Sequence, residues 1–94
     1  MIVEFDPDKD EANRTKHGVQ LLFGALIFDD PDVAIVPTVR IGDEEERFKA
    51  IGVVDRRLWT AIHVWRGDVA RLISVRRSNP GEQRIYDRDP GRLE

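Results

Sequence analysis

The sequence predicts one small α+β domain whose sheet is mostly antiparallel. Three strand-like segments rich in Val, Ile and Trp follow one another between Arg47 and Arg77, with only tight turns between them. Helix-like segments stand before and after them, and two shorter strands precede them. Ninety-four residues, 40% of them apolar, suffice for one hydrophobic core, so residues 1–94 are expected to form a single domain.

The first strand and the first helix have clear boundaries. Residues 2–5 form a short apolar strand. Asp6 can cap the next helix, which has Pro7 at its first position and acidic residues in its first turn. This helix is expected to end at residues 16–17, because Gly18 follows.

The next segment predicts a longer amphipathic helix. Over residues 19–28 the apolar side chains recur at helical spacing, in the stripe Val19, Leu22, Phe23, Leu26 and Ile27. We expect this to be the main helix packed on the sheet, and Pro31 ends it. Residues 33–39 then read as a strand that lies at an edge or is bent at Pro37, and residues 42–46 as a charged turn or mobile loop.

The three-stranded meander predicts two faces of different character. With two-residue turns at residues 56–57 and 67–68, Val53 lies opposite Thr60. One face then has an aliphatic centre and a cationic margin, formed by Arg47, Lys49, Arg66, Arg71 and Arg77. The other face is more apolar and is expected to carry the helices. A bulge in any strand would exchange these assignments.

A closing helix is predicted over about residues 80–87. Ser78 or Asn79 serves as its cap, and Pro80 stands near its first turn. Residues 89–91, Asp-Pro-Gly, end it. The fold therefore comprises a short N-terminal strand, two helices, an edge strand, the meander and a C-terminal helix.

Charge is distributed unevenly along the chain. The net charge of −3 by itself argues against a nucleic-acid-binding protein. Residues 1–55 contain 13 acidic and 6 basic side chains, whereas residues 56–94 contain 5 acidic and 9 basic ones, all of them arginine. Arginine forms bidentate bonds to phosphate and stacks on bases, so the second half suits RNA. The alternative is that these arginines only cover a solvated surface.

Several classes of protein are disfavoured by the composition. The chain has no cysteine, and the carboxylates of residues 43–46 have no companions at metal-ligand spacing, so we expect no metal ion and no cofactor. The longest apolar run, residues 21–28, is too short to span a bilayer. No signal peptide is apparent, and a cytoplasmic location is expected, with no membrane contact.

Five segments stand out together: FDPDKDEANRTKHGV (residues 5–19), FDDP (28–31), EERFKAIG (45–52), HVWRGD (63–68) and LISVRR (72–77), the last followed by Glu82 and Tyr86. In this order and spacing they resemble the BrnT family, the toxin halves of bacterial type II toxin–antitoxin pairs. The family usually has Trp where Phe5 stands and Ala where Ser78 stands.

The resemblance implies a RelE-like fold and a ribonuclease activity that lowers translation. It also implies neutralisation by an antitoxin of the BrnA type, whose DNA-binding part lets the pair repress its own operon. Contact with DNA would then be indirect, through the antitoxin. RNA is the implied substrate.

Metal-free RNA cleavage needs a base for the 2′-hydroxyl, a proton donor for the leaving 5′-oxygen, and cations for the charge that grows on phosphorus. Arg47, Arg76 and Arg77 are the candidate clamps for this charge. Because Arg76 and Arg77 are neighbours in a strand, they point to opposite faces. We favour Arg77, which joins Arg47 on the cationic face, and expect Arg76 to pair with a carboxylate.

His63 is a candidate base or acid, since the ordinary pKa of histidine lies near neutrality. The alternative is a histidine packed among its neighbours, and it is the favoured one because His63 shares the apolar face. Lys16 and His17 are further candidates for proton transfer and RNA binding, although placement at a helix C-terminus would also explain them.

Three other residues complete the expected RNA-binding set. Lys49 and Arg71 lie on the cationic face. Tyr86 could stack on a base or lend its hydroxyl, but anchoring of the last helix to the sheet is the favoured role.

Three functions remain in competition. The first is a ribonuclease toxin, the second a catalytically silent module that binds an antitoxin and tunes its DNA binding, and the third an RNA-binding domain with no antitoxin. An antitoxin could approach the acidic surface or cover the cationic one and so block RNA.

Overall fold

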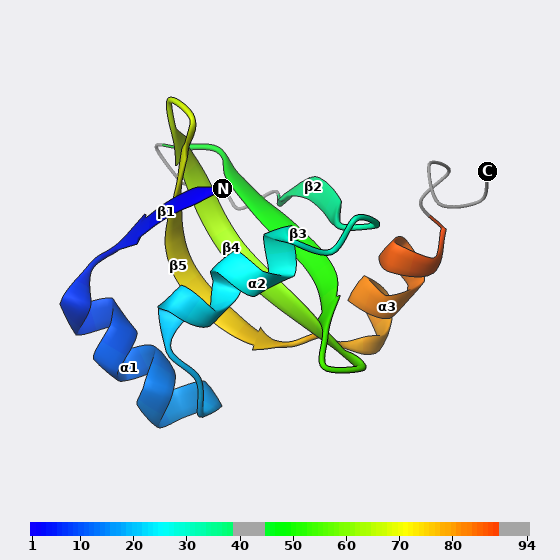
Figure 1. Ribbon diagram of the computed structural model, residues 1–94, viewed down its shortest axis with the longest axis horizontal. Helices are drawn as coiled ribbons and strands as arrows, with labels where there is room; N and C mark the ends of the chain where they lie inside the picture. Colours follow the sequence, from blue (N-terminus) through cyan, green and yellow to red (C-terminus); the bar gives the residue numbers. More distant parts are fainter. Residues whose placement is uncertain (39–44, 89–94) are drawn as a thin grey trace.

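The computed structural model describes residues 1–38 and 45–88. The elements are β1 (Ile2–Phe5), α1 (Pro7–His17), the short 3-10 helix η1 (Leu21–Phe23), α2 (Gly24–Phe28), β2 (Ala34–Thr38), β3 (Arg47–Val54), β4 (Arg57–Arg66), β5 (Val69–Arg77) and α3 (Pro80–Asp87). They form a five-stranded sheet of order β1-β5-β4-β3-β2 (Figure 1). Only the β1–β5 pair is parallel.

This architecture confirms the predicted α+β class and the predicted order of elements. β2, which contains Pro37, lies at one edge of the sheet, as expected. Residues 39 and 42–44 of the predicted edge strand and charged turn, and residues 89–91 after the last helix, lie outside the described residues. The RelE-like relationship stays a prediction.

The boundaries of α1 and α3 follow from their caps. The carboxylate of Asp6 accepts a hydrogen bond from the backbone N–H of Asp8, and Gly18 closes α1 in the left-handed conformation at φ 79°. At α3, Asn79 and Glu82 form a reciprocal capping box. Both helices begin with proline and have the predicted bounds.

The predicted helix over residues 19–28 is shorter than expected and turns a different side to the core. It begins as η1, and only Gly24–Phe28 is α-helical. Leu21, Gly24 and Ile27 face the sheet, where a Cβ at position 24 would come within 3.0 Å of the Val75 side chain. Two members of the predicted stripe point away from the core: Leu22 is 53% exposed and Leu26 is 48% exposed.

The first hairpin turn lies one residue earlier than predicted. Asp55 and Arg56 form it, both with positive φ, so Val53 pairs with Leu58 rather than with Thr60. A two-residue hairpin turn of this kind needs left-handed conformations, which Asp tolerates well. The second turn, at residues 67–68, is where the sequence predicted it.

A β-bulge in the second hairpin changes the register. His63 pairs with Leu72 but Ile62 pairs with Ser74, which makes Ile73 an extra residue in β5. Beyond it, Thr60 pairs with Arg76, and Trp59 pairs with Arg77. The bulge therefore exchanges the faces predicted for residues 74–77.

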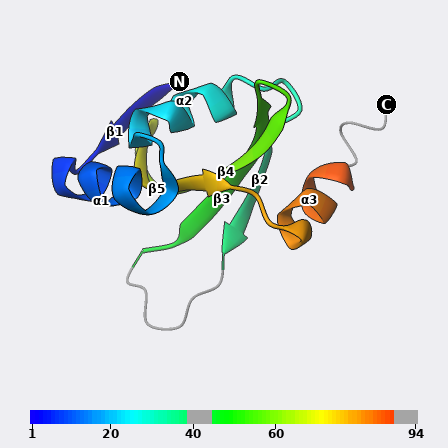
Figure 2. The same cartoon turned by 90° about the horizontal axis from the view of Figure 1, so that it is seen from below.

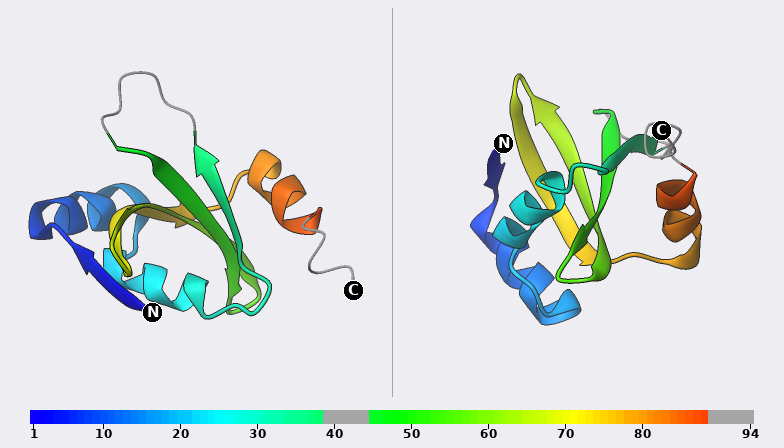
Figure 3. Two further views of the ribbon diagram at one scale, coloured as in Figure 1. Left: turned by 90° about the horizontal axis from the view of Figure 1, so that it is seen from above. Right: turned by 45° about the vertical axis from the view of Figure 1, so that its right-hand side comes forward.

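The helices cover the two faces of the sheet unequally. One side, here called the α2 face, lies against η1 and α2 and forms the main core, with Leu21, Ile27, Ala50, Ala61, Leu72 and Val75 buried (Figures 1 and 2). The opposite side, here called the cationic face, carries Arg47, Lys49, Thr60, Ser74 and Arg76. Only α3 packs on it, near β2 and β3, through Ile85 and Tyr86 (Figure 3). The more apolar face carries η1 and α2, as predicted, whereas α3 lies on the other face.

Candidate functional site

The side chain of Asn13 fixes α1 against β5. Its amide oxygen accepts a hydrogen bond from the N–H of Val75 at 3.0 Å, and its amide nitrogen donates to the carbonyl of Val75 at 2.9 Å. The same nitrogen also donates to the carbonyl of Val19. Asn13 thus acts as a strand partner for β5 at a point where β1 has already ended, since β1 pairs only as far as Leu72.

This junction brings the end of α1 to the edge of the cationic face. A hollow of about 260 Å³ lies there, lined by Lys9, Ala12, Asn13, Lys16 and His17 of α1 and by Ile73 and Ser74 of β5. Ser74 pairs across the strands with Ile62, which in turn pairs with Lys49. The hollow is therefore continuous with the row of side chains that crosses the cationic face.

A buried carboxylate organises the cationic face beside this hollow. Glu82 is 1% exposed and accepts two hydrogen bonds from the guanidinium of Arg76, each at 2.7 Å. The ammonium of Lys49 lies 3.1 Å from its Oε2, and the Thr60 hydroxyl donates to Oε1 at 3.0 Å. The backbone N–H of Asn79 donates to the same oxygen. One carboxylate thus holds two cations.

These contacts set the charge of the cluster. Burial by itself raises the pKa of Glu82, but the bonds from Arg76, Asn79 and Lys49 outweigh it and lower that pKa to about 2. The carboxylate is therefore ionised at neutral pH, and Arg76, Lys49 and Glu82 together carry one net positive charge. Of the five N–H donors of Arg76, two point to Glu82 and one to the carbonyl of Arg77, so two have no partner among residues 1–38 and 45–88.

His17, at the end of α1, has a lowered pKa. Burial lowers its pKa below the ordinary value of 6.5, and the nearby charges of Lys16 and Arg76 lower it further. A helix C-terminus would act in the opposite direction and favour the imidazolium. The net shift keeps the ring neutral at pH 7, so one ring nitrogen can accept a proton.

His63 is not part of this surface. The ring is completely buried on the α2 face, among Phe28, Phe48 and Trp65 at centroid distances of 5.0 to 5.9 Å. Burial lowers its pKa. Its Nδ1 lies 3.4 Å from the carbonyl of Ala61, and Nε2 has no hydrogen-bond partner within the described residues. A ring in this position cannot contact RNA, which supports the packed alternative.

The preference for Arg77 over Arg76 as the clamp on the cationic face is wrong in its geometry. Because of the bulge, Arg77 lies on the α2 face, where its guanidinium carbon is 5.5 Å from the centre of the Trp59 ring. Arg76 occupies the cationic face instead. The expectation that Arg76 pairs with a carboxylate is confirmed by its two bonds to Glu82.

The other predicted site residues lie at different distances from the hollow. Arg47 is on the cationic face opposite Thr38, at the start of β3. Arg71 is near the start of β5, and its guanidinium lies 3.3 Å from the carboxylate of Glu4. Tyr86 is 8% exposed, and its hydroxyl donates to Asp30 at 2.7 Å, which supports the role of anchoring α3.

Sequence reasoning missed Asn13, Ser74 and the central role of Glu82. The spacing of Asn79 and Glu82 was a usable signal, because it is that of a capping box. Nothing local could have shown that the capping carboxylate also binds Arg76 and Lys49. In residues 1–38 and 45–88, no helix is long and apolar enough to cross a membrane, and no three His, Asp or Glu side chains are placed together for a metal ion.

The fold and this site define a class of protein: a small α+β domain with arginine and lysine on one sheet face and a histidine at the helix end beside it, a combination suited to phosphate chemistry. The family model described as the ribonuclease toxin, BrnT, of type II toxin–antitoxin systems matches residues 5–82. The match spans most of the chain, so the protein belongs to this family of ribonuclease toxins, and a type II toxin has a protein antitoxin as its partner. No curated protein matches the chain significantly.

Proposed function

We propose that this toxin is an endoribonuclease that cleaves RNA without a metal ion or cofactor, at the hollow between α1 and the cationic face. The observation that carries the proposal is that Lys16 and His17 line this hollow beside Ser74 of β5, and that Arg76 lies near enough for its charge to lower the pKa of His17. Attack of the 2′-oxygen on phosphorus requires a base and cations of this kind.

In this mechanism His17 takes the proton of the 2′-hydroxyl, and the 2′-oxygen attacks the adjacent phosphorus. The two N–H donors that Arg76 has left bind the non-bridging oxygens as their negative charge grows. Lys16, in the same hollow, is the donor for the leaving 5′-oxygen. The products are a 2′,3′-cyclic phosphate and a 5′-hydroxyl end.

Other residues of the cationic face hold the RNA on either side of this point. Lys49 shares Glu82 with Arg76, and Arg47 is the next basic side chain along β3 on the same face. Arg71 is on β5 two residues before Ile73, which lines the hollow, and it pairs with Glu4. Backbone contacts of this kind make binding dependent on salt and nearly independent of sequence.

In the cell this activity would lower translation in the cytoplasm, and a BrnA-type antitoxin would neutralise it. Any contact of the pair with DNA would then belong to the antitoxin. Family membership supports these finer statements, because the family is that of ribonuclease toxins of type II toxin–antitoxin systems.

The test is RNA cleavage by purified, antitoxin-free protein in EDTA. We expect the parent to cut RNA and His17→Ala to cut it about 10²- to 10⁴-fold more slowly, which is the usual contribution of a positioned base. Arg76→Lys keeps the charge near Glu82 but loses the bidentate bonds, and should also be slower. Arg77→Ala is the matched control and should keep the parental rate.

The outcomes separate the alternatives. Parental activity in a folded His17→Ala protein, or loss of activity in a folded Arg77→Ala protein, would contradict the proposed site. Activity that EDTA abolishes and Mg²⁺ restores would contradict metal independence. If neither free RNA nor ribosome-bound messenger is cut, the silent antitoxin-binding module becomes the better account.

A further inference from the structure

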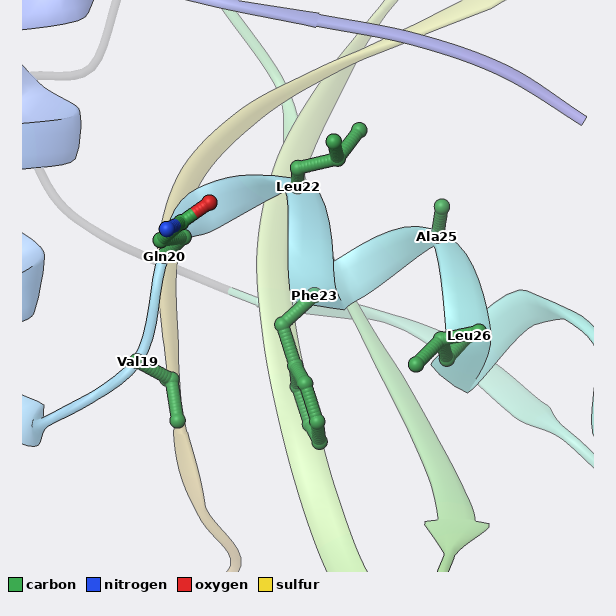
Figure 4. Close-up of a pocket in the computed structure, with 6 residues that line it drawn as sticks. All are labelled: Val19, Gln20, Leu22, Phe23, Ala25 and Leu26. Atoms are coloured by element: carbon green, nitrogen blue, oxygen red, sulfur yellow. The ribbon is translucent and has the colours of Figure 1, made fainter.

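A hollow lies on the outer side of η1 and α2, away from the cationic face. Its volume is about 450 Å³, and it is lined by Val19, Gln20, Leu22, Phe23, Ala25 and Leu26 (Figure 4). Five of these six side chains are apolar. Leu22 and Leu26 are each about half exposed, which places them among the most exposed large apolar residues of the described chain. Large aliphatic side chains gathered at one place on a surface indicate an interaction site.

A second hollow, of about 370 Å³, adjoins the first. It is lined by Phe23, Val54, Asp55, Arg57 and Trp59, so Phe23 belongs to both hollows. The rings of Phe23 and Trp59 meet edge to face at 4.7 Å. The guanidinium of Arg77 lies over the other ring, that of Trp59. The two hollows thus form one surface, here called the α2 groove, which is apolar at one end and bordered by arginine at the other.

The charged end of the α2 groove lacks counter-ions. Arg57 and Arg77 are exposed, and neither pairs with a carboxylate within residues 1–38 and 45–88. Asp55 lines the same hollow but forms no ion pair with them there. By contrast, Arg66, Arg71 and Arg76 each have a carboxylate partner. The groove therefore offers two unneutralised cations next to an apolar hollow.

We propose that the α2 groove binds a segment of the antitoxin: an amphipathic stretch with aliphatic side chains for the hollow beside Leu22 and Leu26, followed by a carboxylate for Arg57 and Arg77. A protein fits this surface better than RNA does, because the larger hollow is lined by aliphatic and aromatic side chains and has no cation. The inference rests on membership of a toxin–antitoxin family and not on the cleavage mechanism.

The test uses the cognate antitoxin, purified with this toxin as a complex. Leu26→Glu should weaken binding at least about thirtyfold, the effect expected when a central anchor is lost. Leu26 is half exposed, so the variant is expected to fold. The matched control is Ile35→Glu: Ile35 is 40% exposed on β2, outside the groove, and the change should leave the affinity within about twofold of the parent.

Charge reversal tests the other end of the groove. Arg57→Glu and Arg77→Glu should each weaken binding about tenfold and reduce its dependence on salt. Hydrogen exchange of the complex should show protection of residues 19–26 and 57–59. Unchanged affinity of the folded Leu26→Glu protein, or protection confined to the cationic face, would overturn the proposal.

The same variants distinguish this inference from the proposed ribonuclease site. Leu26→Glu should cut RNA at the parental rate and escape neutralisation by the antitoxin, whereas His17→Ala should bind the antitoxin normally. If the groove variants bind RNA more weakly but bind the antitoxin as tightly as the parent does, the groove is an RNA-binding surface and the inference fails. A failure of cleavage in every variant would leave the binding result unaffected.

Discussion

The two histidines lie on opposite sides of the sheet, and their surroundings differ in kind. His63 is enclosed by aromatic rings under α2, and its pKa is lowered because burial outweighs the contact with the carbonyl of Ala61. His17 stands at the edge of the cationic face, where the pKa is lowered by partial burial and also by two neighbouring cations. Both rings are neutral at pH 7, but only His17 is accessible. The comparison teaches that a lowered pKa indicates a site only when the group also faces an open surface.

The two sides also differ in how they are held together. The α2 face is a packed apolar core, whereas the cationic face depends on one buried carboxylate that binds two cations. We therefore expect Glu82→Ala to cost about 3–5 kcal/mol in the free energy of unfolding, because Arg76 and Lys49 lose their shared counter-ion. Urea unfolding followed by circular dichroism measures this. Glu45→Ala is the control: that acid pairs with Arg66 at the surface, and its loss should cost less than about 1 kcal/mol. If the two substitutions lowered the free energy of unfolding equally, the ion pairs of Glu82 would not be what stabilises this face.

The position of His17 depends on Asn13, which ties α1 to β5. Asn13→Ala should cost about 2–3 kcal/mol, because it leaves the N–H and carbonyl of Val75 without partners in a buried place. Hydrogen exchange should show faster exchange of the Val75 amide, and RNA cleavage should slow because His17 loses its support. Thr15→Ala, an exposed change on the same helix, should do neither. An Asn13→Ala protein with parental stability would contradict this account of the junction.

The smallest effects are expected in the pH dependence of stability, which separates the two sides. The pKa of His63 is lowered by folding, so the unfolded chain binds the proton more readily, and stability should fall as the pH drops below about 6.5. His63→Phe should remove most of this slope, and His17→Ala a smaller part of it. The pKa of Glu82 is also lowered, to about 2 from 4.5, so its contribution is complete above pH 4.5 and is lost as the pH falls toward 2.

These two windows can be measured in one series of urea titrations from pH 3 to pH 8. Glu82→Gln should flatten the lower window and leave the upper one unchanged. His63→Phe should do the reverse. If both variants showed the same dependence of the unfolding free energy on pH, neither Glu82 nor His63 would control the pH range assigned to it.

Local chemistry made much of the fold predictable. Asp6, Pro7 and Gly18 bound α1, and Asn79 and Pro80 begin α3, because caps act within a few residues of themselves. The alternation of Val, Ile and Trp was enough for the three-stranded meander. The faces predicted for the meander were right as far as Leu72, although the first turn was misplaced. Moving that turn by one residue shifts the pairing by two, and a shift of two leaves each side chain on its face.

The predictions that were wrong concern the faces of β5 and the buried side of residues 19–28, which local sequence patterns do not determine. The extra residue at Ile73 places Arg76 and Arg77 on the faces opposite to those predicted for them. No residue pattern in this strand indicates the bulge. Residues 19–28 hold two apolar stripes, one through Leu21, Gly24 and Ile27 and one through Leu22 and Leu26. The helical period alone did not show which of them would be buried, because that depends on where β5 lies close enough to require a glycine.

The bulge also affects how related chains should be compared. Arg76 and Arg77 are adjacent in a strand and so point to opposite faces, one to a buried carboxylate and the other over an indole ring. The residue inserted before them decides which arginine takes which face. A relative with a segment of the same length but without the bulge would turn its first arginine to the α2 face and its second to the cationic face. Equivalent positions in such a relative must therefore be assigned by counting from the strand pairing rather than from the arginine pair.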